Sequence, residues 1–187
     1  TGALEGQQVV RNLTKRLIPL SEQELIDCSN SNRGCLYGEM SKAMSDIPVI
    51  GGIESEDDYD FIQNYNVRCM FNKSKVVMTD SGSIELPKND LTLLKKVVAK
   101  FGPVSIGMIM NWPYENYRSG IFNDPNCQGT NLNHASLIVG YGTDPEVGDY
   151  WILKEALTER YGEGGFSRIK HGICGIGLVS VIPKFDK

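Results

Sequence analysis

A change of hydrophobic period at Gly102-Pro103 constrains the fold of this sequence more than any other feature. Before this dipeptide the apolar residues recur with helical spacing, and after it they follow strand-like patterns. Ser21 and Glu24 form a capping box at the start of one helix. The predicted helices cover 1–13, a segment from Leu20 onward and 88–101, and the predicted strands cover 104–110, 136–141, 149–154 and 165–170. Helices followed by strands indicate an α+β protein with a helical lobe and a β lobe.

Length and charge exclude several classes of partner. The chain has 187 residues, a net charge of −4 and a pI of about 5.2. Because no basic stripe is available to meet phosphates, we expect no nucleic-acid partner. No apolar run approaches membrane-spanning length, so we expect no membrane partner either. The first residue is Thr1 rather than Met, so we expect the chain to begin inside a longer product.

The five cysteines form an odd set without metal-ligand spacing. They contain no Cys-x-x-Cys pair, and only two histidines accompany them, so we expect no metal site and no cofactor. Scattered cysteines of this kind indicate disulfides and an oxidising compartment. The sequons at Asn12 and Asn72 agree with a secretory route. An odd count implies a free thiol or a missing partner.

Several segments resemble the papain-like cysteine peptidases, of the cathepsin L type, in order and spacing. The segment 131–142 (NLNHASLIVGYG) places His134 at the start of a hydrophobic strand. The other matching segments are 1–7 (TGALEGQ), 20–28 (LSEQELIDC), 102–106 (GPVSI), 150–154 (YWILK) and 162–170 (GEGGFSRIK). The resemblance covers Thr1 to about Pro183. It implies one papain-like domain over 1–187, with a helical lobe at about 1–83, an antiparallel β-barrel-like lobe at 84–182, and a C-terminal tail that crosses back.

The resemblance implies thiol-dependent peptide-bond hydrolysis, but it also implies that the chain lacks part of the site. His134 takes the position of the catalytic base. The nucleophilic cysteine and the oxyanion glutamine of the family would lie upstream of Thr1, in an absent N-terminal segment. By the same resemblance Cys28 pairs with Cys69 and Cys127 pairs with Cys174, which leaves Cys35 unpaired. We therefore expect the chain as given to be catalytically inactive.

Two regions depart from the family pattern. The position that orients the histidine is Asn in the family and Glu155 here, and Leu157 replaces a shielding indole. We favour the interpretation that this stretch has drifted into a surface loop, over a repurposed Glu–His pair. In the substrate loop, Tyr37 brings a bulky side chain beside Gly38, where the family has glycines. The substrate-binding positions implied by the resemblance are Tyr37, Gly38, Met40, Leu132, Asn133, Ala135 and Val179, and core packing is an equal alternative for Met40, Leu132, Ala135 and Val179. We expect the second histidine, His171, to be solvated in a turn.

Three functional hypotheses stay open. The first is a lysosomal or secreted endopeptidase seen as an incomplete product. The second is a monomeric, non-catalytic homologue that binds peptides, protein substrates or inhibitors, or its own missing N-terminal segment or pro-segment. The third is a decayed gene product. The absent segment would leave apolar surface uncovered, so we also expect this chain to be marginally stable or prone to aggregate alone.

Overall fold

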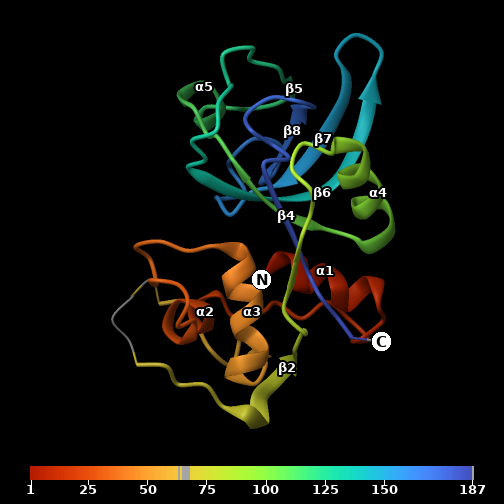
Figure 1. Ribbon diagram of the computed structural model, residues 1–187. Coiled ribbons are helices and arrows are strands. Elements are labelled where there is room, and N and C mark those ends of the chain that lie inside the picture. The colour runs from red at the N-terminus through yellow and green to blue at the C-terminus, as the bar shows by residue number, and fades with distance from the viewer. Residues whose placement is uncertain (63, 65–67, 187) are drawn as a thin grey trace. The chain divides into compact units, whose positions relative to one another are not determined.

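The chain forms two compact units, and a computed structural model describes residues 1–62, 64 and 68–186. The first unit comprises Thr1–Ile84 with Val181–Lys187, and the second unit comprises Glu85–Ser180. Helices dominate the first and strands the second (Figure 1), which confirms the α+β class. Among the described residues, none of the helices is both long and apolar enough to cross a membrane.

Three helices form most of the first unit: α1 (Gly2–Val10), α2 (Glu22–Cys28) and α3 (Met40–Ile50). The side chain of Ser21 accepts a hydrogen bond from the backbone N–H of Glu24, as the capping box predicts. The return bond of that box is not formed, because Oε2 of Glu24 instead accepts from the backbone N–H of Glu54 at 2.7 Å. This bond ties α2 to the short strand that follows α3.

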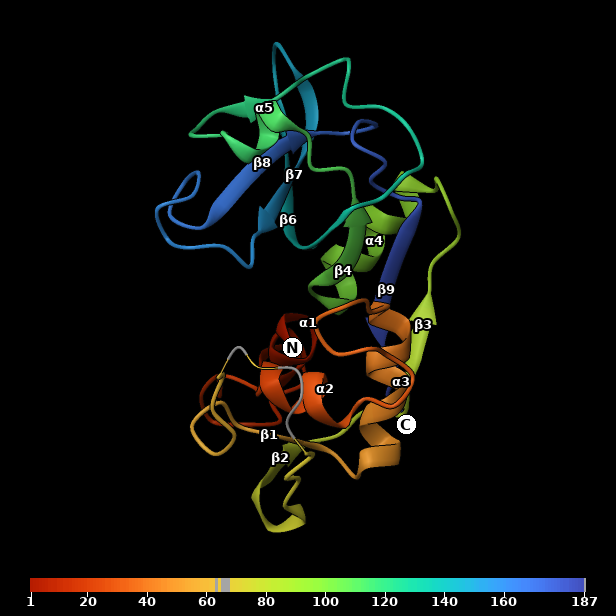
Figure 2. The ribbon, with the colours of Figure 1, turned by 90° about the vertical axis from the view of Figure 1, so that its left-hand side faces the viewer.

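Short strands, drawn in Figure 2, complete the first unit together with an apolar cluster. Strand β1 (Ile53–Glu54) pairs antiparallel with β2 (Val76–Met78), which follows the 3₁₀ turn Lys73–Lys75. The buried residues of the cluster are Leu4, Leu20, Ile47, Ile53 and Met78, and Leu25, Val77 and Phe185 pack against it. The core therefore joins helices and strands that lie far apart in the sequence.

The second unit is built on a β-sheet. The sheet has the strand order β3-β9-β4-β6-β7-β8-β5. Its strands are β3 (Ser83–Glu85), β4 (Val104–Met108), β5 (Ile121–Phe122), β6 (His134–Asp144), β7 (Gly148–Lys154), β8 (Phe166–Lys170) and β9 (Val179–Pro183). Strands β3 and β9 each have residues in both units. β4 pairs antiparallel with β6, β6 with β7 and β7 with β8, whereas β5 and β8 are parallel.

Two helices accompany this sheet. Helix α4 (Leu91–Phe101) is capped by Asp90, whose side chain accepts from the N–H of Leu93, and it packs against β6. The single-turn α5 (Trp112–Glu115) is capped by the side chain of Asn111. The largest fully buried side chains of the second unit are Leu94, Ile106, Met108, Tyr114, Ile138, Trp151, Leu153 and Ile169. They place the core between the sheet and both helices.

Candidate active site

His134 is the first residue of strand β6. Its backbone pairs with Met108 at the end of β4, so two paired strands fix the position of its Cα. Its side chain is 18% exposed. The imidazole is thus partly buried, and its remaining surface is open to a reacting group.

Glu155 directly follows strand β7, and its side chain is fully buried. The backbone N–H of Glu155 donates to the carbonyl of Gly165 at 3.0 Å, which holds the end of β7 against the start of β8. The interpretation of this stretch as a surface loop is therefore wrong at Glu155. It holds for the next residues, because Leu157 is 46% exposed.

His134 and Glu155 form a close pair, which was the less favoured alternative from the sequence. Nε2 of His134 lies 2.8 Å from Oε2 of Glu155. A carboxylate can only accept hydrogen bonds, so Nε2 carries the proton in this contact. The other ring nitrogen, Nδ1, then remains to accept or donate a proton. An imidazole oriented through one nitrogen and reactive through the other is the arrangement of a general acid–base group.

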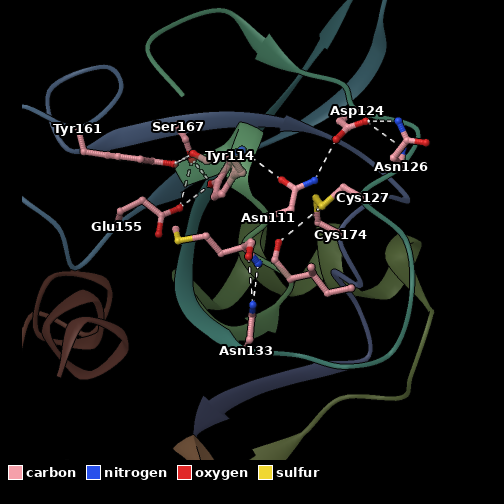
Figure 3. Close-up of a disulfide and its surroundings, with 12 residues drawn as sticks. Asn111, Tyr114, Asp124, Asn126, Cys127, Asn133, Glu155, Tyr161, Ser167 and Cys174 are labelled. Carbon is pink, nitrogen blue, oxygen red and sulfur yellow. Dashed lines mark hydrogen bonds between the residues drawn. A yellow bond between two sulfur atoms is a disulfide. The ribbon is translucent and has the colours of Figure 1, made fainter. Parts of the chain in front are cut away.

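The second oxygen of Glu155 is bound by hydroxyl groups (Figure 3). The hydroxyl of Tyr114 donates to Oε1 at 2.6 Å, and Oγ of Ser167 lies 2.6 Å from the Tyr114 oxygen and 3.3 Å from Oε1. Tyr114 and Ser167 are fully buried. Burial and the neighbouring Glu155 charge raise the pKa of Tyr114 above its ordinary value, so this hydroxyl stays protonated. Sequence reasoning missed both residues: Tyr114 lies outside the matching segments, and Ser167 lies within 162–170 without any sign that it contacts Glu155.

Three of the predicted pocket residues gather around Gly107 in the second unit. Ala135 pairs with Gly107 across β4 and β6. A Cβ at Gly107 would lie 2.9 Å from Cδ1 of Leu132 and 3.3 Å from Cβ of Val179. Val179 is 37% exposed and Ala135 is exposed as well. These side chains therefore form a partly open apolar surface next to His134 in the sequence, and not a closed core.

The fourth predicted residue of this unit, Asn133, is engaged in backbone bonds (Figure 3). Its Oδ1 accepts from the N–H of Met110 at 2.8 Å, and its Nδ2 donates to the carbonyl of Met110 at 3.1 Å. Asn133 thus anchors the chain just before His134. In this structure its side chain holds the loop after β4.

The predicted residues of the first unit lie in one loop and the helix start that follows it. Tyr37 is 59% exposed, and its hydroxyl donates to Glu39 at 3.0 Å. A Cβ at Gly38 would make an ordinary contact of 3.5 Å with Asn32. Met40 opens helix α3 and is partly buried. Their substrate-binding role stays a prediction.

All five cysteines have a defined state. Cys28 is bonded to Cys69 and Cys127 to Cys174, the pairs that the resemblance implies. Cys35 is a free, exposed thiol in the first unit. Within the described residues, no group of three or more His, Cys, Asp or Glu side chains is arranged to hold a metal ion.

His171 lies in a turn as predicted, but the expectation that its ring is solvated is wrong. Its side chain is only 16% exposed, and its ring stacks on the indole of Trp151. The residue follows β8, and its backbone N–H donates to the carbonyl of Asp149 on β7. This backbone bond to β7 places the His171 ring against the sheet. From the sequence alone, a histidine in a turn would be expected to have a solvated ring.

Comparisons with known proteins agree with this architecture. The family described as papain family cysteine protease matches residues 1–183. Cathepsin L of Sarcophaga peregrina is 39% identical over 189 residues, which covers 98% of this chain and 55% of that protein. Cathepsin K of Mus musculus is 36% identical, and the match covers 98% of this chain and 56% of that protein. The chain thus spans about half the length of the curated relatives that it matches.

Solved structures show the same fold. Digestive procathepsin L 3 from the Tenebrio molitor larval midgut superposes with a TM-score of 0.90 at 38% identity, covering 98% of this chain and 60% of that one. Bromelain protease from Ananas comosus, solved in complex with the E64 inhibitor, gives a TM-score of 0.86 at 31% identity, covering 98% and 86%. With the family match over nearly all of its length, this chain belongs to the papain family of cysteine proteases.

Proposed function

We propose that the chain carries the histidine part of a thiol peptidase site, and that as given it does not hydrolyse peptide bonds. The observation that carries the proposal is the 2.8 Å contact between Nε2 of His134 and Oε2 of Glu155. A histidine held in this way lowers the pKa of a facing thiol and protonates the leaving amine. A fully buried carboxylate with donors to both oxygens also argues against the hypothesis of a decayed gene product, because an unsatisfied buried charge would be costly.

The proposed inactivity follows from the state of the cysteines. Four of the five form disulfides, and a disulfide sulfur is not a thiolate nucleophile. The remaining thiol, Cys35, lies in the loop that the resemblance assigns to substrate binding. If Cys35 is not the nucleophile, peptide hydrolysis would need a thiol from residues other than Thr1–Lys187.

Peptidase assays of three chains test this proposal. The chain as given, His134→Ala and Cys35→Ser are incubated with fluorogenic peptide substrates under mild reduction. We expect no hydrolysis by the given chain above that of either variant. Hydrolysis that is lost in both His134→Ala and Cys35→Ser would show that Cys35 acts as the nucleophile, and the proposed inactivity would be wrong.

Binding of peptides or inhibitors without catalysis is the second candidate function. Leu36 and Tyr37 are 76% and 59% exposed, so their loop offers apolar and aromatic surface to a partner. Three of the similar structures are proforms, which supports a pro-segment as another partner. The two disulfides support a secretory route to the lysosome or the cell exterior.

Fluorescence anisotropy with a labelled apolar peptide tests the binding function. The double variant Leu36→Ser with Tyr37→Ser should bind the peptide at least tenfold more weakly than the original chain. Equal affinity of the two proteins would exclude this loop as the binding site.

A further inference from the structure

The buried hydroxyls around Glu155 form an ordered chain of donors. An ionised Glu155 offers only acceptors, so the single proton of the Tyr114 hydroxyl points to Oε1. The oxygen of Tyr114 is then an acceptor, and Ser167 donates to it at 2.6 Å. The order of donation runs from Ser167 through Tyr114 to Glu155. Such chains strengthen each member bond by polarisation.

The backbone and the ring of Tyr114 are both held by neighbouring residues. Its backbone N–H donates to Oδ1 of Asn111 at 3.1 Å, and its carbonyl accepts from the hydroxyl of Tyr161 at 2.7 Å. Nδ2 of Asn111 donates in turn to Asp124 at 2.9 Å, and the Phe122 ring lies edge-on to Tyr114 with 5.0 Å between centroids. Figure 3 shows Asn111, Tyr161 and Ser167 around Tyr114. The hydroxyl therefore occupies one defined position.

We propose that Tyr114 and Ser167 are positioning residues that hold Oε1 of Glu155, so that Oε2 faces Nε2 of His134 and the imidazole keeps its proton on Nε2. A carboxylate bound only by His134 would be free to rotate about its last bonds. With Oε1 fixed by the Tyr114 hydroxyl, which Ser167 holds in turn, rotation breaks a buried charge-assisted hydrogen bond. The orientation of His134 is thus set by a hydroxyl pair that contacts neither the imidazole nor a substrate. The inference rests on the His134–Glu155 pair proposed above.

The test reads the His134 ring directly. The full chain is labelled with ¹⁵N-histidine, and the Nε2–H proton and ring nitrogens are observed by NMR at about pH 8.5, where an ordinary imidazole is neutral. A protected low-field Nε2–H signal reports a proton held between Nε2 and a carboxylate. His134→Ala and His171→Phe assign the signals of the two histidines.

Three variants and one matched control decide the outcome. We expect Tyr114→Phe and Ser167→Ala to lose the protected Nε2–H signal, and Ser167→Thr, which restores a hydroxyl, to retain it. Tyr117→Phe is the control, because it removes another buried tyrosine hydroxyl, one that donates to Gly120 and not to Glu155. If Tyr114→Phe fails to fold, the comparison of Ser167→Ala with Ser167→Thr still decides.

Two results would overturn the inference. Retention of the signal in Tyr114→Phe and Ser167→Ala would mean that the hydroxyls only satisfy a buried charge. Equal loss in Tyr117→Phe would mean that general loosening is responsible. Glu155→Leu, which has no acceptor, separates this inference from the proposed function: an unchanged signal there would remove the His134–Glu155 pair itself, whereas inactivity in a peptidase assay leaves the NMR result unaffected.

Discussion

The ring of His171 stacks on the indole of Trp151, with 3.9 Å between the ring centroids. Nε2 of His171 is buried and has no hydrogen-bond partner among the described residues, and Nδ1 lies 4.0 Å from Oδ2 of Asp149. Burial lowers the pKa of His171 below its ordinary 6.5, and the nearby Asp149 charge only partly opposes this shift. The folded state therefore favours the neutral ring.

The burial of the His171 ring predicts that the second unit becomes less stable in acid. The unfolded chain binds a proton at His171 more readily than the folded chain, so the stabilisation is present above pH 6.5 and is lost as the pH falls below it. His171→Phe keeps a flat ring on Trp151 but cannot titrate. Urea unfolding between about pH 7.5 and about pH 5 should show a smaller decline in the variant. An identical decline in both proteins would contradict the prediction.

Glu24 predicts the opposite pH dependence in the first unit. Burial raises its pKa from 4.5 to about 7, against the hydrogen bond from the N–H of Glu54. For a raised carboxyl pKa, the stabilisation is full below pH 4.5 and is lost as the pH rises through about 7. The shift corresponds to at most about 3 kcal/mol. Asp80 has its pKa raised to about 7 in the same way, so Glu24 accounts for only part of the change.

Glu24→Gln should remove that part. Denaturant unfolding of Glu24→Gln, measured from about pH 4 to about pH 8, should show a weaker loss of stability toward high pH. Glu22→Gln is the matched control, because Glu22 lies on the same helix and is exposed. If both variants follow the original curve, Glu24 does not titrate in this range.

Gly107→Ala should disturb the apolar surface formed by Leu132, Ala135 and Val179. The new Cβ would approach Leu132 within 2.9 Å, and the side chain of Leu132 must move to make room. Overpacking of this kind costs about 1–3 kcal/mol. Gly38→Ala is the control, since its Cβ would meet Asn32 at an ordinary 3.5 Å. Thermal unfolding should separate the two variants, and equal midpoints would show that Leu132 adapts without cost.

The disulfide between Cys127 and Cys174 should contribute strongly to stability. It closes a loop with a sequence separation of 47 and links the segment before β6 to the segment after β8. Cys127→Ala with Cys174→Ala should lower the free energy of unfolding by about 2–5 kcal/mol, because the unfolded chain gains freedom. Denaturant unfolding measures this loss, with Cys35→Ala as the control that breaks no crosslink. A loss no larger than the control's would contradict the prediction.

The sequence predicted those helices and strands that are specified by nearby residues, through capping and hydrophobic periodicity. The Ser21 cap and the strands predicted at 136–141 and 149–154, which the structure extends to His134–Asp144 and Gly148–Lys154, follow from capping and periodicity. Helix α3 was missed, because Pro48 and the glycines beyond it read as breaks. The structure accommodates Pro48 in the last turn, and Gly51 ends the helix with a φ of 117°.

The candidate site was only half predictable, for a physical reason. His134 could be predicted from its place at the start of a strand and from the resemblance of that segment to the family pattern. The burial of Glu155, by contrast, depends on partners 12 and 41 residues away. Neither Tyr114 nor Ser167 has a spacing that connects it to Glu155. The same holds for His171, whose cover is supplied by Trp151 on a neighbouring strand. Long-range polar contacts leave no periodic trace in a sequence.

The closed bonding of Glu155 also couples this position to its neighbours in any sequence change. An asparagine here would have a shorter side chain and one acceptor oxygen, where the carboxylate now offers one oxygen to His134 and the other to Tyr114. A buried donor that loses its partner costs about 1–3 kcal/mol. Substitutions at Glu155 and Tyr114 are therefore epistatic, because the cost of changing one depends on which side chain occupies the other position.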